Sequence, residues 1–360
     1  MSEVGIGFGG RLIAAVAAAL LVASTGTVAA GTPPDEVPYP DQPVGVPFPT
    51  DEWAIGELPA EVDRHALDLA VERAFGAPDA ERRVRSLLIV HRGAIVYERY
   101  HPLDGPDTVM DSFSIAKSVV SALIGTLVAD GALDLDAPAP VAAWQTPGDP
   151  RAAITLRQLM QMSGGLPDSN AGLLAAPDGA EYAAGLDLVH EPGTTFEYSD
   201  ATAALLAGIA AETLGGCDAA IAALHERILD PIGITSDELL LDQAGCWRGF
   251  IGANMTARDF ARFGLLYLRG GSWDGEEILP SSWIDQSWAP SPTNPDYGLQ
   301  WWRYQDDVFF AVGLGGQYLD VVPDADMVIV LTGTVGSATG ELIDAANFIM
   351  SAAAGGWTYT

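Results

Sequence analysis

The sequence predicts an α+β protein with a mainly antiparallel sheet that is built from both ends of the chain and flanked by helices. Strand-like apolar patterns occur at residues 86–100 and again at 308–332, whereas helical patterns dominate the chain between them. With 360 residues and 49% hydrophobic side chains, the chain can bury a sizeable core. We therefore expect an all-helical region inserted between the two halves of one sheet.

Residues 60–360 are expected to form one domain, with a sheet part at 60–110 and 245–360 and a helical part at 111–244. The predicted helices have apolar positions that follow a helical period. They lie at residues 61–75, 114–130, 155–162, 201–214, 218–229, 256–269 and 340–354. The predicted strands are short apolar runs bounded by turn residues. They lie at residues 86–90, 94–100, 308–312, 317–322 and 327–332.

The first thirty residues have the pattern of a secretory signal peptide. Arg11 precedes an apolar run at residues 12–23, and small residues follow up to a cleavage signal at 28–30. The run is short for a membrane span of about 20 residues, but its extension to residue 30 leaves an uncleaved anchor as the alternative. The sequence thus predicts a secreted or periplasmic protein, with a proline-rich leader at residues 31–59 before the domain.

The charge balance argues against several classes of function. The chain has 48 acidic and 17 basic residues, a formal net charge of −31. Such a surface repels phosphate backbones and anionic lipid headgroups, so we expect no nucleic-acid partner and no membrane partner beyond the N-terminal segment. Five histidines without an HExxH motif and only two cysteines argue against a zinc site. We expect neither a metal nor a cofactor.

The two cysteines are Cys217 and Cys246. In an exported protein they can form a disulfide, which would close a loop of ~30 residues and contribute about 3–4 kcal/mol. Two separate buried thiols are the alternative, and the sequence does not decide between them.

Lys117 is the only lysine of the chain, and the other sixteen basic residues are arginines. Arginine stays protonated in proteins, whereas a lysine amine can be tuned to lose its proton. Ser114 precedes Lys117 by three residues in a predicted helix, so the two side chains share one helix face. A neutral lysine amine can activate a serine hydroxyl as a nucleophile. We therefore predict a catalytic pair in which burial keeps the Lys117 amine neutral.

Tyr198 is a further candidate for proton transfer. It lies in the run FEYSD at residues 196–200, on a loop before a predicted helix. A tyrosine hydroxyl near Lys117 can pass the proton of Ser114 to a leaving group. The chain contains no GxSxG motif, which disfavours an α/β-hydrolase nucleophile elbow.

With these motifs, the chain resembles the serine β-lactamase and penicillin-binding-protein superfamily. The likeness is strongest to its esterase and amidase branch, which includes 6-aminohexanoate-dimer hydrolase-like proteins and esterases related to class C β-lactamases. Each supporting segment is short, and the signal comes from their shared order along nearly the whole mature chain. The segments are SFSIAKS at 112–118, ITLR to MSGGL at 154–166, PG to YS at 192–199, TARDFARFG at 256–264, YGLQWW at 297–302 and AVGLGGQY at 311–318.

The resemblance implies a β-lactamase/transpeptidase-like fold and a role for individual residues. Ser114 would be the acylated nucleophile, Lys117 its base partner and Tyr198 the proton shuttle. The backbone N–H groups of Ser114 and Leu314 would form the oxyanion hole, where negative charge develops on the tetrahedral intermediate. The expected substrate-binding residues are Asp200, Gly313, Gly315 and Gln317.

Two departures from the β-lactam-acting relatives point away from their substrates. At the positions that correspond to 311–313, those relatives have Lys or His, then Thr or Ser, then Gly, whereas this chain has Ala311, Val312 and Gly313. The cation and hydroxyl that would bind a substrate carboxylate are therefore missing. Asp200 stands where those relatives have Asn, and its charge would keep an adjacent Lys117 protonated and would repel anionic substrates.

We therefore expect a secreted serine hydrolase that cleaves carboxylic esters or small amides through a Ser114 acyl-enzyme. Its expected partner is a small-molecule ester or amide substrate. The alternatives are a β-lactamase or a D-aminopeptidase/DD-carboxypeptidase and, from another class, a catalytically silent relative that only binds a ligand.

Overall fold

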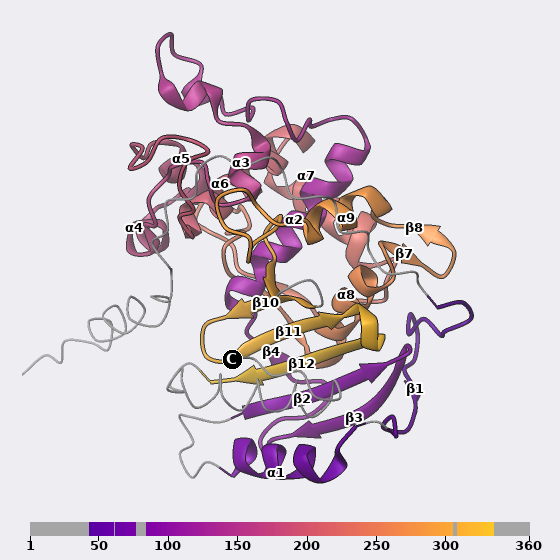
Figure 1. The fold of residues 1–360 in the computed structure, drawn as a ribbon. Coiled ribbons are helices and arrows are strands. Elements are labelled where there is room, and N and C mark those ends of the chain that lie inside the picture. The colour runs from indigo at the N-terminus through magenta and orange to yellow at the C-terminus, as the bar shows by residue number, and fades with distance from the viewer. Residues whose placement is uncertain (1–42, 61, 77–83, 305–307, 335–360) are drawn as a thin grey trace, which may run out of the picture. The chain divides into compact units, whose positions relative to one another are not determined.

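The computed structural model describes residues 43–60, 62–76, 84–304 and 308–334 (Figure 1). The strands are β1 (Ala54–Ile55), β2 (Val84–His91), β3 (Ala94–Tyr100), β4 (Val109–Met110), β5 (Glu238–Leu239), β6 (Ala253–Thr256), β7 (Ser272–Trp273), β8 (Glu276–Glu277), β9 (Trp302–Tyr304), β10 (Val308–Gly313), β11 (Gln317–Val322) and β12 (Met327–Gly333). The α-helices are α1 (Arg64–Phe75), α2 (Ala116–Ala129), α3 (Leu156–Met160), α4 (Asn170–Ala175), α5 (Gly179–Ala184), α6 (Asp200–Leu214), α7 (Cys217–Leu224), α8 (Ala257–Leu268) and α9 (Ser281–Trp288).

One seven-stranded sheet joins strands from the two ends of the described chain. Its order is β1-β3-β2-β12-β11-β10-β9, and every neighbouring pair except β1 with β3 is antiparallel. The pairing of β2 with β12, in which Ile89 lies opposite Ile329, connects the early strands to the late ones. Between them lies a region that is mainly helical (Figure 1). The predicted fold class, a mainly antiparallel sheet with an inserted helical region, is confirmed.

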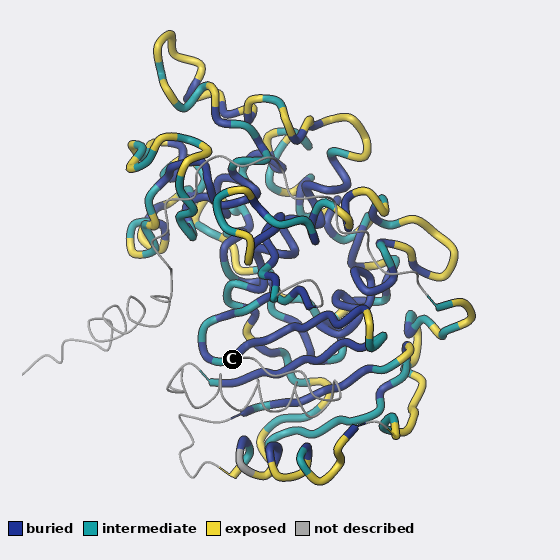
Figure 2. The backbone as a smooth tube through the Cα atoms, viewed as in Figure 1, coloured by how far each residue is buried: buried dark blue, intermediate teal, exposed yellow. Residues whose placement is uncertain are grey.

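Each face of the main sheet is buried against a different set of side chains. Along β2, Leu88 and Val90 contact the larger core, which includes α2 and α8, whereas Leu87 and Ile89 contact the smaller core around α1. Successive side chains of a strand point to opposite faces, so both sets are apolar only because both faces are covered. Figure 2 shows the resulting buried track along the central strands.

Helix α8 approaches the sheet closely through a glycine. A Cβ atom on Gly264 would lie 2.7 Å from Leu319 and 2.8 Å from Val328, which are residues of β11 and β12. The missing side chain therefore lets the helix backbone pack directly on the sheet. In Figure 1, α8 and α1 lie on opposite sides of the sheet.

Helix α2 runs through the larger core, and its residues from Ala116 to Leu127 are all buried. The helix contacts α6, which is also largely buried. A helix that is apolar on all sides is stable only inside a protein core, and α2 meets that condition. This setting places Lys117, in the first turn of α2, away from water.

The structure shifts several predicted element boundaries. The helix predicted at 114–130 begins as a 3₁₀ turn, Phe113–Ile115, before α2 starts at Ala116. The helix predicted at 155–162 is only Leu156–Met160, because Thr155 caps it and Met162 has a positive φ of 55°.

Other predicted helices differ at their ends or fall outside the description. The helix predicted at 218–229 ends as α7 at Leu224 and continues as a π-helical turn, His225–Leu229. Helices α4, α5 and α9 are additional to the prediction. The helix predicted at 340–354, the predicted signal peptide at 1–30 and the first part of the leader, residues 31–42, lie outside the described residues.

A disulfide joins Cys217, the first residue of α7, to Cys246 in the loop before β6. Of the two states that the sequence left open, the structure has the bonded one. The bridge connects two segments of the helical region that are 29 residues apart in the chain.

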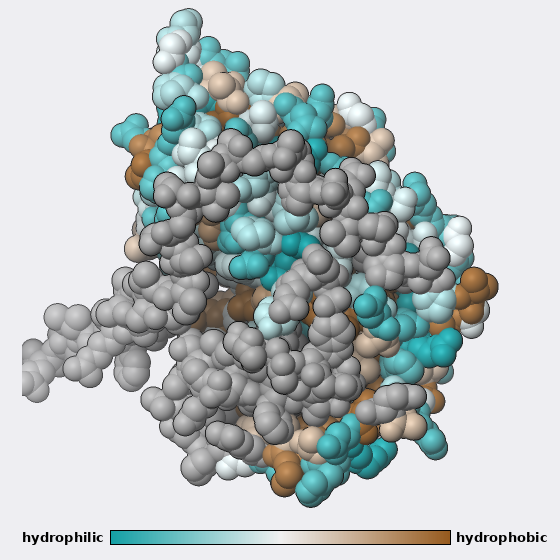
Figure 3. Space-filling view, viewed as in Figure 1, coloured by the Kyte–Doolittle hydropathy of each residue, from teal (hydrophilic) through white to brown (hydrophobic). Residues whose placement is uncertain are grey.

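Polar residues cover much of the visible described surface, and hydrophobic residues occur there in separate patches (Figure 3). Among the described residues, none of the helices is by itself long and apolar enough to cross a membrane. One bent pair, Asp200–Leu214 with Cys217–Leu229, reaches the necessary length and apolar composition only when the two helices are taken together. No group of three or more metal-ligating His, Cys, Asp or Glu side chains occurs in the described parts of the chain.

Replacement of both cysteines by serine is expected to lower the free energy of unfolding by about 3–4 kcal/mol, because the unfolded chain gains the entropy of an open loop. Urea unfolding of the Cys217→Ser/Cys246→Ser variant and of the parent, with and without reductant, measures this difference. Reductant should destabilise the parent and leave the variant unchanged. Equal unfolding midpoints for parent and variant without reductant would contradict the expectation.

Candidate active site

Ser114 lies in the 3₁₀ turn that leads into α2, with its side chain partly exposed. The preceding residue, Phe113, has a φ of +43°, in the left-handed region that non-glycine residues rarely adopt. Ser112 fixes the segment to β6, because its N–H donates to Asn254 Oδ1 at 2.9 Å and its hydroxyl accepts from the N–H of Ala253 at 2.9 Å. The strained turn therefore presents Ser114 from an anchored backbone.

Lys117 lies one helical turn after Ser114, and its side chain is 2% exposed. Its Nζ donates to Ser114 Oγ at 2.9 Å, to Asp200 Oδ1 at 2.6 Å and to the carbonyl oxygen of Phe250 at 3.2 Å. The structure thus brings the predicted pair into direct contact. It adds two partners, one from the start of α6 and one from the loop before β6.

The surroundings of Lys117 favour a protonated side chain over the neutral amine predicted from the sequence. Burial alone lowers the pKa of a lysine, but the negative charge of Asp200, with smaller contributions from Tyr198, outweighs burial and raises the pKa of Lys117. An ammonium has three N–H donors, and three acceptors surround this nitrogen. The raised pKa and the three contacts together favour an ammonium on Lys117, paired with the carboxylate of Asp200.

Asp200 is the first residue of α6, and its side chain is 15% exposed. Its Oδ2 accepts a hydrogen bond from Asn170 Nδ2 at 2.5 Å, which leaves Oδ1 directed to Lys117. The positive end of the helix dipole favours a carboxylate in the first turn. Asp200 was predicted to bind substrate, whereas here its two oxygens bind Lys117 and Asn170.

Asp168 adds a second carboxylate to this region. Its Oδ1 accepts from the backbone N–H of Asp200 at 3.1 Å. Asp168 is an exposed residue. Partial loss of hydration and, to a smaller extent, the negative charge of Asp200 raise the pKa of its carboxyl group. Asp168 lies in the loop after α3, and Asn170 begins α4. No helical or strand period was recognised in this segment of the sequence, so the pattern gave no signal for either residue.

Tyr198 faces Lys117 with its aromatic ring. Nζ of Lys117 lies 4.9 Å from the ring centroid, within the range of a cation–π interaction. The ring stacks on Trp302 at 5.5 Å and meets Tyr297 edge-on at 6.2 Å. These contacts hold the three predicted catalytic side chains, Ser114, Lys117 and Tyr198, in one cluster.

The end of β10 lies against the segment before Ser114. A Cβ atom on Gly313 would be 2.4 Å from the carbonyl oxygen of Ser112 and 3.0 Å from Cβ of Phe113, so only glycine fits there. Gly315 follows in the turn to β11 with a φ of +85°. The contact places the peptide group of Leu314 directly after the point where β10 meets this segment.

Gln317 has a different position from the predicted one. Its side chain is fully buried, donates from Nε2 to the carbonyl oxygen of Gly333 at 2.9 Å and to that of Leu314 at 3.4 Å, and accepts from the N–H of Gly333. A side chain in this position ties the β10–β11 turn to the end of β12. Gln317 was predicted to contact substrate, and in the structure its side chain supports this turn.

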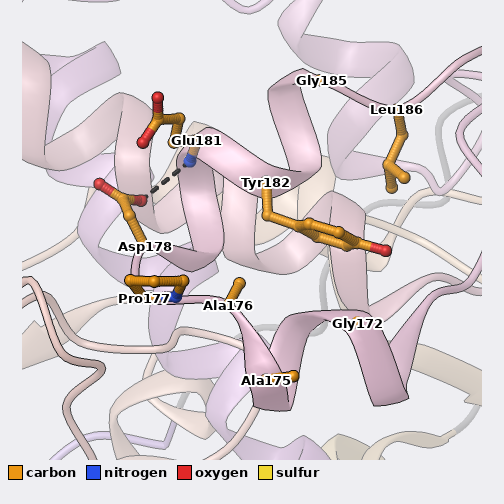
Figure 4. A pocket seen from close by; sticks show the side chains of 9 residues that line it. All are labelled: Gly172, Ala175, Ala176, Pro177, Asp178, Glu181, Tyr182, Gly185 and Leu186. Carbon is orange, nitrogen blue, oxygen red and sulfur yellow. Dashed lines mark hydrogen bonds between the residues drawn. The ribbon is translucent and has the colours of Figure 1, made fainter.

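A hollow of ≈ 580 Å³ opens between α4 and α5 (Figure 4). Its apolar wall includes Tyr182, whose hydroxyl points away from Asp178 and Glu181 and forms a 2.7 Å hydrogen bond with the hydroxyl of Ser169. Ser114, Lys117 and Tyr198 do not line this hollow. The catalytic cluster and the hollow are thus separate features.

Comparison with known proteins gives a consistent picture of the fold. A family model described as Beta-lactamase matches residues 71–354. The 6-aminohexanoate-dimer hydrolase of Paenarthrobacter ureafaciens is 24% identical over 293 residues, which cover 70% of this chain and 74% of that protein.

Solved structures share the architecture as well. A Bacillus anthracis protein provisionally named as a 6-aminohexanoate-dimer hydrolase has a TM-score of 0.70 at 24% identity, covering 85% of this chain and 88% of that one. A family VIII carboxylesterase has a TM-score of 0.59 at 17% identity, covering 81% of this chain and 98% of that one.

Substitution of Gly313 by alanine is expected to slow the reaction of Ser114 with a serine-directed electrophile about 100-fold, because the new Cβ would push β10 and the Leu314 peptide away from the nucleophile segment. The rate of probe incorporation measures the effect. Gly105→Ala, at a glycine with open space around it, is the matched control and should react at the parental rate. A parental rate for Gly313→Ala would contradict the proposed approach of β10.

Replacement of Lys117 by methionine is expected to abolish this reactivity and to lower the free energy of unfolding by about 3 kcal/mol, because Asp200 loses its cationic partner. The double variant Lys117→Met/Asp200→Asn removes the uncompensated charge and should recover part of the lost stability. Thermal unfolding of the parent, the two single variants and the double variant tests this coupling. Strictly additive effects would show that the two side chains do not stabilise each other.

Proposed function

The chain belongs to the beta-lactamase family, a fold of hydrolases related to amidases and esterases, and on that premise we propose that it cleaves carboxylic esters or small amides through a Ser114 acyl-enzyme. The observation that carries this proposal is the 2.9 Å contact between Oγ of Ser114 and Nζ of the only lysine. The hydroxyl is partly exposed and the amine is buried, an arrangement suited to a nucleophile and its activating group.

In the proposed reaction, Lys117 first loses one proton. Its neutral amine then accepts the proton of Ser114 while Oγ attacks the substrate carbonyl carbon. The backbone N–H groups of Ser114 and Leu314 stabilise the oxyanion, a contribution of about 3–4 kcal/mol for each donor. Tyr198 passes the proton to the leaving alcohol or amine as the bond to carbon breaks. Water then hydrolyses the acyl-enzyme by the reverse sequence of proton transfers.

Esters and small amides are favoured over β-lactams by the residues at the end of β10. Ala311 and Val312 offer neither a cation nor a hydroxyl for a substrate carboxylate, and Asp200 adds negative charge near Lys117. The names of two similar proteins, a 6-aminohexanoate-dimer hydrolase and a carboxylesterase, agree with amide and ester substrates. Esters and small amides with an uncharged acyl group are therefore the proposed substrates.

We also propose that the protein is exported. Support comes from the signal-like pattern of the first thirty residues and from the disulfide between Cys217 and Cys246, since disulfides persist in oxidising compartments.

A fluorophosphonate probe is expected to label the parent once, at Ser114, at a rate that increases with pH, because the hydroxyl attacks the electrophilic phosphorus when Lys117 has lost a proton. Intact-mass spectrometry should show the adduct in the parent and its loss in Ser114→Ala. Ser282→Ala, which removes an exposed serine of α9, is the control and should be labelled as the parent is. A folded parent that stays unlabelled would instead favour a relative that binds a ligand without turnover.

Hydrolysis rates across a substrate panel test the substrate class. Short-chain p-nitrophenyl esters and linear amides should give higher kcat/KM than a chromogenic cephalosporin, whose carboxylate finds no cation at the end of β10. Faster turnover of the cephalosporin would reverse the proposed order in favour of a β-lactamase.

A further inference from the structure

We propose that Asp200 is a positioning residue that holds Lys117 as an ammonium in the resting enzyme and thereby sets the pH above which Ser114 becomes activated. This role deepens the proposed function and rests on it, since it concerns the same Ser114–Lys117 pair. The geometry around a single nitrogen carries the inference. Three oxygen atoms, from Ser114, Asp200 and Phe250, lie within 3.2 Å of Nζ, and the side chain is almost fully buried.

The three acceptors are not equivalent. The carboxylate of Asp200 and the carbonyl of Phe250 can only accept hydrogen bonds, whereas the hydroxyl of Ser114 can also donate one. When Lys117 loses a proton, its two remaining N–H groups stay on the two obligate acceptors. The lone pair then faces Ser114, and the hydrogen bond between Oγ and Nζ reverses direction. The site is thus arranged so that loss of one proton converts a resting cation into a base aimed at the nucleophile.

Asp200 is itself held in place, which makes its charge a fixed part of the site. Asn170 donates to Oδ2 at 2.5 Å, and the backbone N–H of Asp200 donates to Oδ1 of Asp168 at 3.1 Å. A carboxylate free to rotate into water would be screened by solvent and would act weakly on Lys117. The Asn170 contact keeps Oδ1 at 2.6 Å from Nζ instead.

The titratable groups around Lys117 come from three segments. Asp200 belongs to α6, Tyr198 to the loop before it, and Asp168 to the loop after α3, whose charge interacts favourably with Lys117. Tyr297 lies behind Tyr198, and burial raises its pKa well above the ordinary value, so it stays neutral. Asp200 makes the largest favourable contribution to the protonated form of Lys117 and is the only carboxylate of this group in contact with Nζ.

The sign of the pH effect follows directly. With Asp200 present, the pKa of Lys117 is raised, so the neutral amine forms only as the pH increases through that value. Asparagine at position 200 keeps the size of the side chain and removes its charge. Burial is then the dominant influence, and it lowers the pKa of Lys117. The acidic limb of kcat/KM should therefore move to lower pH in Asp200→Asn.

The single lysine makes a direct measurement available. Protein grown with ¹³C,¹⁵N-lysine carries one labelled side chain, so the Nζ and Cε signals report Lys117 without further assignment. In the parent, these signals should remain those of an ammonium up to and beyond the ordinary lysine pKa of about 10.4. In Asp200→Asn, the titration midpoint should fall by at least one pH unit. Glu276→Gln also removes one negative charge, from an exposed strand, and should leave the midpoint unchanged.

A parental midpoint below the ordinary lysine value would overturn the inference without the use of any variant. An unchanged midpoint in folded Asp200→Asn would overturn it as well. The kcat/KM profile provides the functional counterpart, and its acidic limb should shift by the same number of pH units as the lysine signal. Failure of the proposed function is distinct, since it would appear as absent fluorophosphonate labelling while the lysine titration still reports on Asp200.

Discussion

The ion pair between Lys117 and Asp200 is the interaction on which the site depends. A lysine with 2% of its side chain exposed loses nearly all its hydration, and an unpaired charge in that position would be strongly destabilising. Asp200 supplies the opposite charge at 2.6 Å, while Ser114 and Phe250 satisfy the remaining N–H groups. Stability and reactivity therefore oppose each other here, because the contact that makes the buried amine tolerable also delays its loss of a proton.

The fold assembles this pair from segments that are distant in the chain. Helix α2 supplies Lys117, α6 supplies Asp200, and the start of α4 supplies Asn170. The sheet contributes as well, since Gly313 lets β10 approach the backbone before Ser114 and buried Gln317 ties the following turn to β12. The pairing of β2 with β12 joins the late strands to the early part of the chain, which contains Ser114. The antiparallel sheet thus acts as the frame that places a strand end opposite a helix start.

Much of this framework could be predicted from the sequence, because apolar residues at buried positions recur with the period of a helix or a strand. The strand predicted at 317–322 matches β11 residue for residue, and α6 begins one residue before its predicted start. Motif order was enough to bring together Ser114, Lys117 and Tyr198, which the structure indeed clusters.

Contacts between side chains that are far apart in the sequence do not produce such a pattern. Asn170 begins α4, a short helix that the sequence did not predict. The contact between Asp200 and Lys117 was only conditional until the structure placed Oδ1 of Asp200 beside Nζ. The neutral amine of Lys117 was predicted from its apolar neighbours along α2. These neighbours indicate burial, but they do not indicate that α6 places a carboxylate beside the amine. Gln317 follows the glycines of the family motif, so its sequence position suggested substrate contact while its buried side chain supports the turn.

Neutron diffraction from a deuterium-exchanged crystal of the resting enzyme near neutral pD would test the central claim most directly, because it locates the hydrogen atoms on Nζ. The account predicts three deuterons on Lys117, directed to Ser114 Oγ, Asp200 Oδ1 and the carbonyl oxygen of Phe250. Two deuterons on Nζ, with the hydroxyl deuteron of Ser114 pointing at the nitrogen, would contradict it.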